Sequence, residues 1–448
     1  MKENRADRLF GTDGIRGAVG TFPLDKESLE KLGNAIHTVL EPIAVIMGGD
    51  TRHSCFVIQS GLMAGILNRT EVHICDVIST PGLSYLVGQG PFDYGIMITA
   101  SHNVFTDNGI KILAANGEKI SDDLERQIED VFFSMKTAKT VEAIRCDAFK
   151  DLDLYKDLLR RHLPGNTGRG KRWKIVLDCA NGAVFQIAPE IFGESGFDIH
   201  TIHAKPTGLN INEGCGSTQP ASLQKAVIEE RADLGIAFDG DGDRVIFVGP
   251  QGRILDGDYS LLMIADLFRK YPQENGFNDL VVGTVMSNLG LEKALRQRGI
   301  RFLRTPVGDR YVYAEMKKTN AVLGGEQSGH TILRGYQKTG DGILTALFFL
   351  KALLECEVSP ADVHRSMTQY PQVTRSIRVK EKKDLGQWDE FQQMVTGFNE
   401  KFGENSRLVV RYSGTEAKIR IMIESELQEI IDENINKFEG LIKSRIGA

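Results

Sequence analysis

The sequence has no closely spaced pair of cysteines and no large excess of positive or negative charge. Its 448 residues carry 54 Lys and Arg against 60 Asp and Glu, for a formal net charge of −6. No global field therefore favours nucleic acid or anionic membranes, and any bound phosphate needs local basic residues. The six cysteines include no CxxC pair, which speaks against a structural zinc site and a disulfide scaffold. A reducing cytoplasm fits this pattern.

Long hydrophobic runs are also missing. The most apolar predicted helix, residues 343–354, is too short to span a bilayer and contains Lys351. The stretch MKENRADRLFGTDGIRG lacks the apolar core of a signal peptide. We therefore expect a soluble, cytoplasmic protein. A chain of this length with 41% hydrophobic residues can bury several cores, and three or four domains are expected.

Short runs rich in Val and Ile alternate with longer amphipathic stretches. Examples are IAVIMGGD, YGIMITASHN, KIVLDCANGA, LGIAFDGDGD, LVVGTVMSN and NAVLGGEQSGH. This alternation predicts α/β units with largely parallel sheets, whose ligands gather beyond the carboxyl ends of the strands. The last segment differs, because NSRLVVRYSGTEAKIRIMIES reads as two strands around a loop and is followed by a helix. It predicts a small α+β domain.

Two familiar motifs fail on inspection. GNTGRGKR matches a phosphate-binding P-loop, but Arg172 stands where Ser or Thr should bind magnesium, and the motif precedes a strand. We interpret it as a linker. DGDGDR begins like a calcium loop, yet Arg244 and Pro250 stand where glycine and glutamate are needed. An EF-hand is excluded.

Three carboxylates alternate with glycines in FDGDGDR, at the end of an apolar run: Asp239, Asp241 and Asp243. Hard cations bind oxygen ligands, and phosphate oxygens often complete a magnesium site. The alternative is a solvated Asp-Gly turn in a hairpin. The strict alternation favours a metal site.

A second candidate site lies near the C-terminus, in RYSGTEAKIR. Its guanidinium, hydroxyl and glycine-flanked backbone groups are the donors that a phosphate dianion requires. The residues are Arg411, Ser413, Gly414, Thr415 and Arg420. The alternative is a hairpin turn with ordinary surface arginines.

Three further loops carry weaker signals. GGEQSGH offers Glu326, Ser328 and His330 after a predicted strand, and such groups bind sugar hydroxyls or move protons. FGTDGIRG and GGDTRHS place Arg16 and Arg52 among small residues. Each of these arginines alone is more typical of a surface or interdomain ion pair than of a ligand.

Ser101, in ITASHN, follows an apolar run. A cap or turn is one interpretation. A hydrolase triad fits poorly, because there is no GxSxG elbow and His102 is adjacent in sequence. Together with a metal loop and a phosphate loop, the serine favours phosphoryl transfer through a serine ester.

Taken together these motifs resemble the α-D-phosphohexomutase family over nearly the whole chain. The stretches that carry the resemblance, in that family's order, are FGTDGIRG, GGDTR, ITASHN, NGIKI, LNINEGCGSTQP, DGDGDR, VVGTVMSNLG, VGDRYV, GGEQSGH, TGDGILTAL and RYSGTE. The resemblance implies three related α/β domains with mainly parallel mixed sheets and a smaller α+β domain around a central cleft. We place these domains at residues 1–153, 154–255, 256–365 and 366–448.

The resemblance also implies roles. Ser101 would carry a phosphoryl group, and the three aspartates with a phosphoserine oxygen would hold one magnesium ion. Lys111, His330, His102 and Arg16 would move protons or stabilise charge, with Lys111 and His330 ranked ahead of His102, and Arg244 would help to balance charge. Glu326 and Ser328 would bind the sugar, and the C-terminal loop would grip the non-reacting phosphate.

The implied reaction interconverts glucosamine 6-phosphate and glucosamine 1-phosphate through a 1,6-bisphosphate, for UDP-N-acetylglucosamine and cell-wall synthesis, in a monomer or homodimer without nucleic-acid or membrane partners. Glucose or mannose phosphates are the alternative substrates, and a phosphatase or a non-catalytic sugar-phosphate binder are the alternative classes. Val104 and Ala417 stand where the family usually has proline, which puts loop rigidity in doubt.

Overall fold

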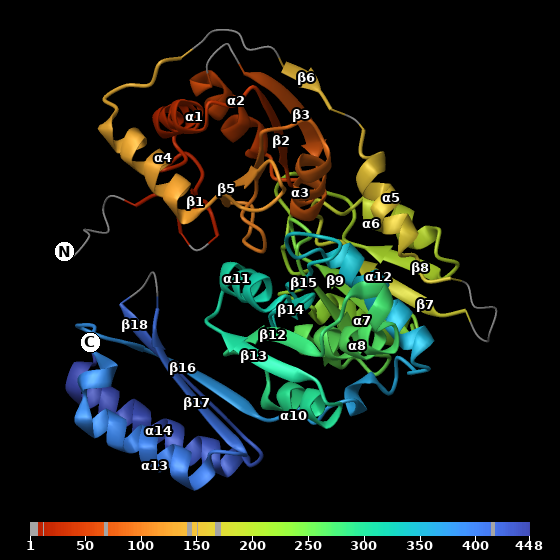
Figure 1. Ribbon diagram of the computed structural model, residues 1–448, viewed down its shortest axis with the longest axis vertical. Coiled ribbons are helices and arrows are strands. Elements are labelled where there is room, and N and C mark those ends of the chain that lie inside the picture. Colours follow the sequence, from red (N-terminus) through yellow and green to blue (C-terminus); the bar gives the residue numbers. More distant parts are fainter. Residues whose placement is uncertain are drawn as a thin grey trace.

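The computed structural model describes residues 8–11, 13–66, 70–140, 146–149, 151–165, 172–413 and 417–448. Within these residues four sheets follow one another along the chain, each covered by helices (Figure 1). Residues 166–171, the central part of the predicted linker motif at 165–172, lie outside the described residues.

The first sheet is mixed, with the order β1-β5-β4-β2-β3-β6. Its central strands are parallel, and the pairs β1–β5 and β4–β5 are antiparallel. The strands are β1 (Ile15–Ala18), β2 (Ala44–Gly49), β3 (Glu71–Val77), β4 (Tyr94–Ile98), β5 (Asp107–Ala114) and β6 (Cys146–Ala148). Three helices contribute to the core on one face and α3 to the core on the other. The helices are α1 (Lys26–Leu40), α2 (Cys55–Gly65), α3 (Thr80–Gln89) and α4 (Asp122–Ser134).

The second and third sheets repeat this plan of parallel strands with antiparallel partners at one edge. The second has the order β11-β10-β9-β7-β8 and the third β13-β12-β14-β15. The second unit contains α5 (Asp153–Arg161), β7 (Lys174–Asp178), α6 (Ile187–Gly193), β8 (Asp198–Ile202), α7 (Ala221–Glu229), β9 (Leu234–Phe238), β10 (Val245–Val248) and β11 (Ile254–Leu255). The third contains α8 (Gly257–Lys270), α9 (Pro272–Asn275), β12 (Leu280–Thr284), α10 (Leu289–Gln297), β13 (Arg301–Thr305), α11 (Asp309–Thr319), β14 (Leu323–Gly325), β15 (Thr331–Leu333) and α12 (Gly342–Glu355). All five residues of β9 and of β12 are buried, as expected of strands covered on both faces.

The fourth sheet is antiparallel, with the order β16-β18-β17. Its elements are β16 (Gln372–Arg378), α13 (Asp389–Phe402), β17 (Ser406–Tyr412), β18 (Lys418–Ser425) and α14 (Gln428–Ile446). Figure 1 shows α13 and α14 side by side on one face of this sheet. Alternate residues of β18, such as Ile419 and Ile421, join the helices in one core, so Arg420 and Glu424 lie on the opposite face.

One core runs through the second and third units. It extends from Tyr155 to Met367 and includes Phe247 stacked on Phe349 with ring centroids 3.8 Å apart. The predicted helix at 343–354 is confirmed as α12, which is almost entirely buried in this core. Among the described residues, no helix combines the length and apolar character needed to cross a bilayer.

The four predicted functional loops share one position in their sheets. Each connects two antiparallel neighbours, in the pairs β4–β5, β9–β10, β14–β15 and β17–β18. The hairpin interpretation of the Asp-Gly loop and its metal interpretation are therefore compatible. The predicted fold class of three α/β units and a smaller α+β unit is confirmed.

Candidate active site

Ser101 lies in the loop between β4 and β5, and its side chain is buried. Its φ of +51° is in the left-handed region, which serine rarely adopts. The Ser101 N–H donates to Thr99 Oγ1 at 2.9 Å, and Thr99 Oγ1 donates to Asp50 Oδ2 at 2.7 Å. Such a conformation costs on the order of 1–3 kcal/mol and is maintained only where the surroundings enforce it, as at many functional sites.

Arg52 is the main support of this loop. Its side chain has no exposed surface, and its Nε lies 3.0 Å from Asp50 Oδ2. The guanidinium donates to backbone carbonyls along the loop, those of Ser101, Asn103, Val104 and Asp107. A surface or interdomain ion pair was the wrong interpretation of this arginine, because its ion pair is buried within the first unit and most of its donors hold the serine loop.

A second support comes from the second unit. Asn212 Nδ2 lies 2.8 Å from the carbonyl oxygen of Ser101 and 2.8 Å from that of Asn103. Asn212 is itself buried, and its N–H donates to the Ala180 carbonyl at 2.9 Å. The serine loop is thus fixed between two units of the chain.

The Asp-Gly loop between β9 and β10 brings its three carboxylates to Ser101. Ser101 Oγ donates to Asp239 Oδ2 at 2.8 Å. Ligand atoms of Asp239, Asp241 and Asp243 all lie within 4.8 Å of one another, and all three residues are buried. Burial, followed by the charges of Asp243 and Asp241, raises the pKa of Asp239 well above its ordinary value.

These carboxylates fit a divalent cation. Oδ1 of Asp241 and Oδ1 of Asp243 are buried without a hydrogen-bond partner. Unpaired buried oxygens are costly, and several carboxylates crowded together repel one another. An oxygen-binding dication removes both costs, which makes this cluster the strongest metal-site candidate among the described residues.

Lys111 on β5 supplies positive charge to the same cluster. Its Nζ lies 3.0 Å from Asp241 Oδ2, 3.4 Å from Asp243 Oδ2 and 3.2 Å from Asp13 Oδ2. Burial alone would lower the pKa of Lys111, but Asp13, Asp241 and Asp243 raise it well above its ordinary value. The ammonium therefore stays protonated at neutral pH.

His102 faces the same site in a different electrostatic state. Its Nδ1 lies 3.4 Å from Ser101 Oγ. Burial and then the cations Arg244 and Arg16 lower the pKa of His102 to about 4. Arg16 pairs with Asp13 at 2.5 Å, and Arg244 Nε lies 3.7 Å from Asp243 Oδ1. The imidazole is neutral at pH 7 and can accept a proton.

The third unit brings its own loop to the cluster. His330 Nδ1 lies 3.6 Å from Asp243 Oδ2. Burial would lower the pKa of His330, but Asp243 raises it above its ordinary value. Glu326 accepts from the Gly308 N–H at 3.0 Å, and Ser328 Oγ lies 3.5 Å from Glu326 Oε2. The predicted sugar-binding loop thus adjoins the predicted metal loop.

The C-terminal loop belongs to the fourth sheet. Arg411 on β17 and Arg420 on β18 are directly paired across the strands, on the face away from α13 and α14. Burial and then Arg420 lower the pKa of Arg411. Like charges placed opposite one another are unfavourable without an anion. Ser413 is buried at the end of β17, whereas Gly414 and Thr415 lie outside the described residues.

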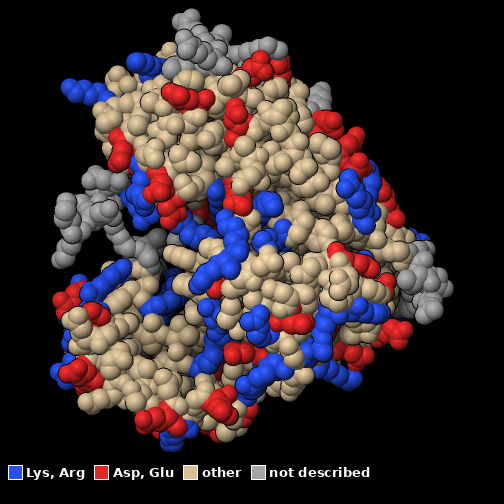
Figure 2. Space-filling model, viewed as in Figure 1, with Lys and Arg blue, Asp and Glu red and all other residues tan. Residues whose placement is uncertain are grey.

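The face of the fourth sheet that lies away from α13 and α14 contacts the third unit. Arg407 Nη2 donates to the Val285 carbonyl at 2.7 Å, and the Leu289 N–H donates to Glu424 Oε1 at 2.8 Å. Figure 2 shows a hollow between this sheet and the other units, with Lys and Arg side chains along its walls. Arg411 and Arg420 lie on the same face of the sheet as Arg407 and Glu424.

Sequence reasoning missed several residues that organise the site. Asn212 and Asp13 stand in the motifs without a predicted role, the pattern predicts only an ion pair for Arg52, and no motif includes Thr80, which donates to Asp241 Oδ2 at 2.6 Å. The signal available for Arg52 was its place in GGDTR, next to a predicted strand end, and that for Asn212 was its place in LNINEGCGSTQP, one of the stretches that carry the family resemblance. Nothing in the sequence marks Thr80, because its role depends on contact between the first and second units.

A serine held against clustered carboxylates, with cations around it and an arginine pair on a separate sheet, is the arrangement expected of an enzyme that acts on phosphorylated substrates. The chain belongs to the phosphoglucomutase/phosphomannomutase family. It matches that family's α/β/α domain I at residues 7–139, domain II at 154–252, domain III at 256–370 and C-terminal domain at 376–438.

Individual members of this family are similar to the chain over nearly its full length. The chain is 39% identical to the phosphoglucosamine mutase of Syntrophobacter fumaroxidans, over 98% of this chain and 99% of the relative. A phosphoglucomutase/phosphomannomutase family protein from Burkholderia thailandensis has the same fold, with a TM-score of 0.80, 19% identity and 99% of each chain covered. The N-acetylphosphoglucosamine mutase of Aspergillus fumigatus, solved with GlcNAc-6P and magnesium, gives a TM-score of 0.68 at 15% identity, over 97% of this chain and 95% of that one.

Proposed function

We propose that this enzyme is a phosphoglucosamine mutase, which interconverts glucosamine 6-phosphate and glucosamine 1-phosphate. The observation that carries the proposal is the contact of Ser101 Oγ with Asp239 Oδ2 at 2.8 Å, inside a buried cluster of three aspartates. The full-length similarity to phosphoglucosamine mutases supports the choice of substrate. The product would supply UDP-N-acetylglucosamine synthesis.

The covalent step uses Ser101. In the phosphorylated enzyme the bond between phosphorus and Ser101 Oγ breaks and a bond between phosphorus and O1 of glucosamine 6-phosphate forms. The sugar hydroxyl loses its proton to a nearby base, and Ser101 Oγ takes up a proton. The resulting 1,6-bisphosphate reorients and returns its 6-phosphoryl group to Ser101, which leaves glucosamine 1-phosphate. Asp239, Asp241 and Asp243 are proposed to hold magnesium, which when bound neutralises charge at the phosphoserine and polarises its phosphorus for attack.

The side chains around Ser101 divide the work by charge. Lys111 remains protonated because three carboxylates surround it, so we assign it to neutralising the phosphoryl group, which adds about −1.5 to −2 charge. Arg16 and Arg244 add to this field. His102 lies beside Oγ, and we assign it to accept the Ser101 proton when the 6-phosphoryl group returns to the serine. His330 lies near Asp243, and we assign its protonated imidazole the role of stabilising negative charge at the site.

Substrate positioning is assigned to the third and fourth units. Glu326 and Ser328 offer a carboxylate and a hydroxyl to the sugar, since carboxylate and hydroxyl groups bind sugar hydroxyls well. Arg411, Ser413, Gly414, Thr415 and Arg420 are assigned to the non-reacting phosphate. Two guanidinium groups on one sheet face suit a phosphate dianion, which accepts paired N–H donors.

The test compares kcat/KM for the 1-phosphates of glucosamine, glucose and mannose. All three are measured with the same preparation of phosphorylated enzyme and the same bisphosphate activator. We expect glucosamine phosphate to be preferred, with weaker activity on glucose phosphate and the weakest on mannose phosphate. An amine and a hydroxyl at C2 differ little, so the preference is expected to be only about a hundredfold. A higher kcat/KM for glucose or mannose phosphate would assign the enzyme to the phosphoglucomutase/phosphomannomutase activities. Free phosphate as the product would indicate a phosphatase.

A further inference from the structure

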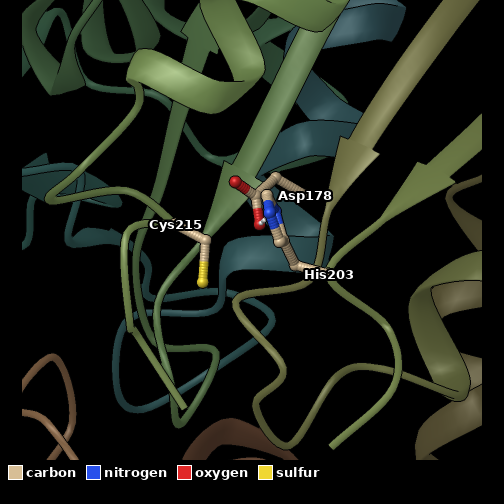
Figure 3. Close-up of side chains that lie close together, drawn as sticks. All are labelled: Asp178, His203 and Cys215. Atoms are coloured by element: carbon tan, nitrogen blue, oxygen red, sulfur yellow. Dashed lines mark ion pairs between the residues drawn. The ribbon is translucent and has the colours of Figure 1, made fainter. Parts of the chain in front are cut away.

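A second group of metal-ligating side chains lies in the second unit and takes no part in the proposed reaction. Asp178 is the last residue of β7, His203 follows β8, and Cys215 lies in the loop that leads to α7. Figure 3 shows these three side chains close together on separate segments, with His203 facing Asp178 and Cys215 beside them. One ligand atom of each lies within 4.8 Å of those of the other two.

We infer that Asp178, His203 and Cys215 form a binding site for a zinc-class divalent ion, separate from the proposed magnesium site. A thiolate and an imidazole favour zinc or cobalt over magnesium, which prefers an all-oxygen environment. The lack of a CxxC pair excludes only the usual ligand spacing within one loop. Here the parallel strands β7 and β8 place two of the ligands at one edge of the sheet.

The spacing of the ligand atoms suits such an ion. His203 Nδ1 lies 3.1 Å from Asp178 Oδ1. Ligand atoms of a tetrahedral zinc site are about 3.4 Å apart, given metal–ligand bonds of about 2.0–2.3 Å. Small side-chain shifts therefore convert the cluster into three ligands, and a water can complete the coordination from the side of His203, which is 29% exposed.

The carboxylate and the imidazole are both held in place. Asp178 accepts from the Ala180 N–H at 2.9 Å through Oδ1 and from the Gly216 N–H at 2.9 Å through Oδ2. His203 has a φ of +49°, and its carbonyl accepts from the Asn181 N–H at 2.7 Å. Such outer contacts orient metal ligands in known sites.

The ring and the thiol both favour a ligand role. His203 Nδ1 faces Asp178 Oδ1 at 3.1 Å, so a divalent ion would take the place of a proton between the imidazole and the carboxylate. Cys215 is fully buried, and its Sγ lies within 4.8 Å of the ligand atoms of Asp178 and His203. Binding of the ion would release the thiol proton to solvent and leave the thiolate as a ligand.

The site has a structural route to the serine loop. The Asn212 N–H donates to the Ala180 carbonyl, and the Asn212 amide holds the carbonyls of Ser101 and Asn103. The Ser217 N–H, two residues after Cys215, donates at 2.8 Å to the carbonyl of Phe238, next to Asp239. An ion at Cys215 would therefore restrain the segments that flank both active-site loops.

The test is a cobalt titration of the full-length protein in excess magnesium. We expect one Co²⁺ per chain with a thiolate-to-cobalt absorption band in the near ultraviolet. Cys215→Ala should abolish the band, and His203→Gln should weaken Co²⁺ binding by more than about 100-fold, because even losses in the outer shell cost about 10–100-fold. Cys179→Ala and His200→Ala, at neighbouring positions outside the cluster, should retain it.

Two further measurements make the result decisive. Asp241→Asn should keep the band, since that residue belongs to the other site, and Zn²⁺ should displace Co²⁺ and raise the melting temperature of the wild type but not of His203→Gln. Because His203 is partly exposed, this variant tests the site even if Cys215→Ala fails to fold. Absence of a thiolate band in the wild type, its persistence in Cys215→Ala, or its loss in Asp241→Asn would overturn the inference.

Discussion

The serine loop and the C-terminal loop are built in different ways. Ser101 is held by Arg52 from its own unit and by Asn212 and Asp239 from the second unit. The arginine pair of the C-terminal loop stands on a small sheet with a core of its own. One region is embedded between units of the chain, and the other is carried by a separate layer.

Contacts between the units differ in the same sense. The first and third units are joined by ion pairs, including Lys119 with Asp309 at 2.6 Å and Lys317 with Glu118 at 2.9 Å. The fourth unit meets the third through β17 and β18, where Arg407 Nη2 donates to the Val285 carbonyl at 2.7 Å and Glu424 Oε1 accepts from the Leu289 N–H at 2.8 Å. Because the serine loop is fixed between units and the arginine pair lies on a separate sheet, we expect the serine loop to set the rate of chemistry and the fourth unit to set substrate affinity.

The largest effect is expected from the embedded carboxylates. Asp241→Asn should lower turnover by about 100-fold or more and weaken magnesium binding, because an amide lacks the charge that binds a hard dication. EDTA should abolish the turnover of the wild type, and added magnesium should restore it. Steady-state kinetics and a magnesium titration check both points, with Asp198→Asn on the exposed end of β8 as the control. Full activity in excess EDTA would contradict the metal assignment.

A smaller effect is expected when the serine loop loses its support. Lysine cannot reproduce the several donors that Arg52 directs at the loop carbonyls, so Arg52→Lys should lower kcat by about 10–100-fold while KM changes little. In this variant Ser101 should also take up its phosphoryl group from the bisphosphate more slowly. A loss of stability that leaves the geometry of the serine loop unchanged would not slow this step. A melting curve separates this effect from unfolding. An unchanged kcat would show that the loop needs no such support.

The smallest effect on turnover is expected in the fourth unit. Arg420→Gln should raise KM by about 10–100-fold and change kcat by less than about threefold, because a hydrogen bond between charged groups contributes about 1.5–3 kcal/mol. Arg375→Gln, on the other face of the same sheet, is the matched control. If kcat fell instead while KM stayed constant, the division between the two regions would be wrong.

The fold and the loops that carry the proposed active-site residues could largely be predicted from the sequence. Apolar runs that end in polar residues predicted the strands and the positions of Ser101, Asp239 and Glu326, since strand ends follow directly from local patterning. The C-terminal strands and helix were predicted for the same reason and are confirmed as β17, β18 and α14.

The supports of the site could not be predicted in this way. Arg52 reads as a surface arginine because burial of its guanidinium depends on four carbonyls of a distant loop. The order of Lys111 and His102 as proton acceptors also depends on tertiary structure, because the surrounding carboxylates and cations set their pKa values in opposite directions. Such information lies in contacts between units, which local sequence patterns do not contain.

The central claim, that Ser101 carries the phosphoryl group, is tested most directly by mass spectrometry. The protein is incubated with glucosamine 1,6-bisphosphate and magnesium, and its intact mass and peptides are measured before and after glucosamine 6-phosphate is added. We predict one added phosphoryl group on the peptide that contains Ser101, no uptake by Ser101→Ala, and, with an isotopically labelled phosphoryl group on Ser101 and free bisphosphate removed, transfer of the label to glucosamine 1-phosphate when substrate is added. A phosphoryl group on another residue, or full turnover by Ser101→Ala, would contradict the account.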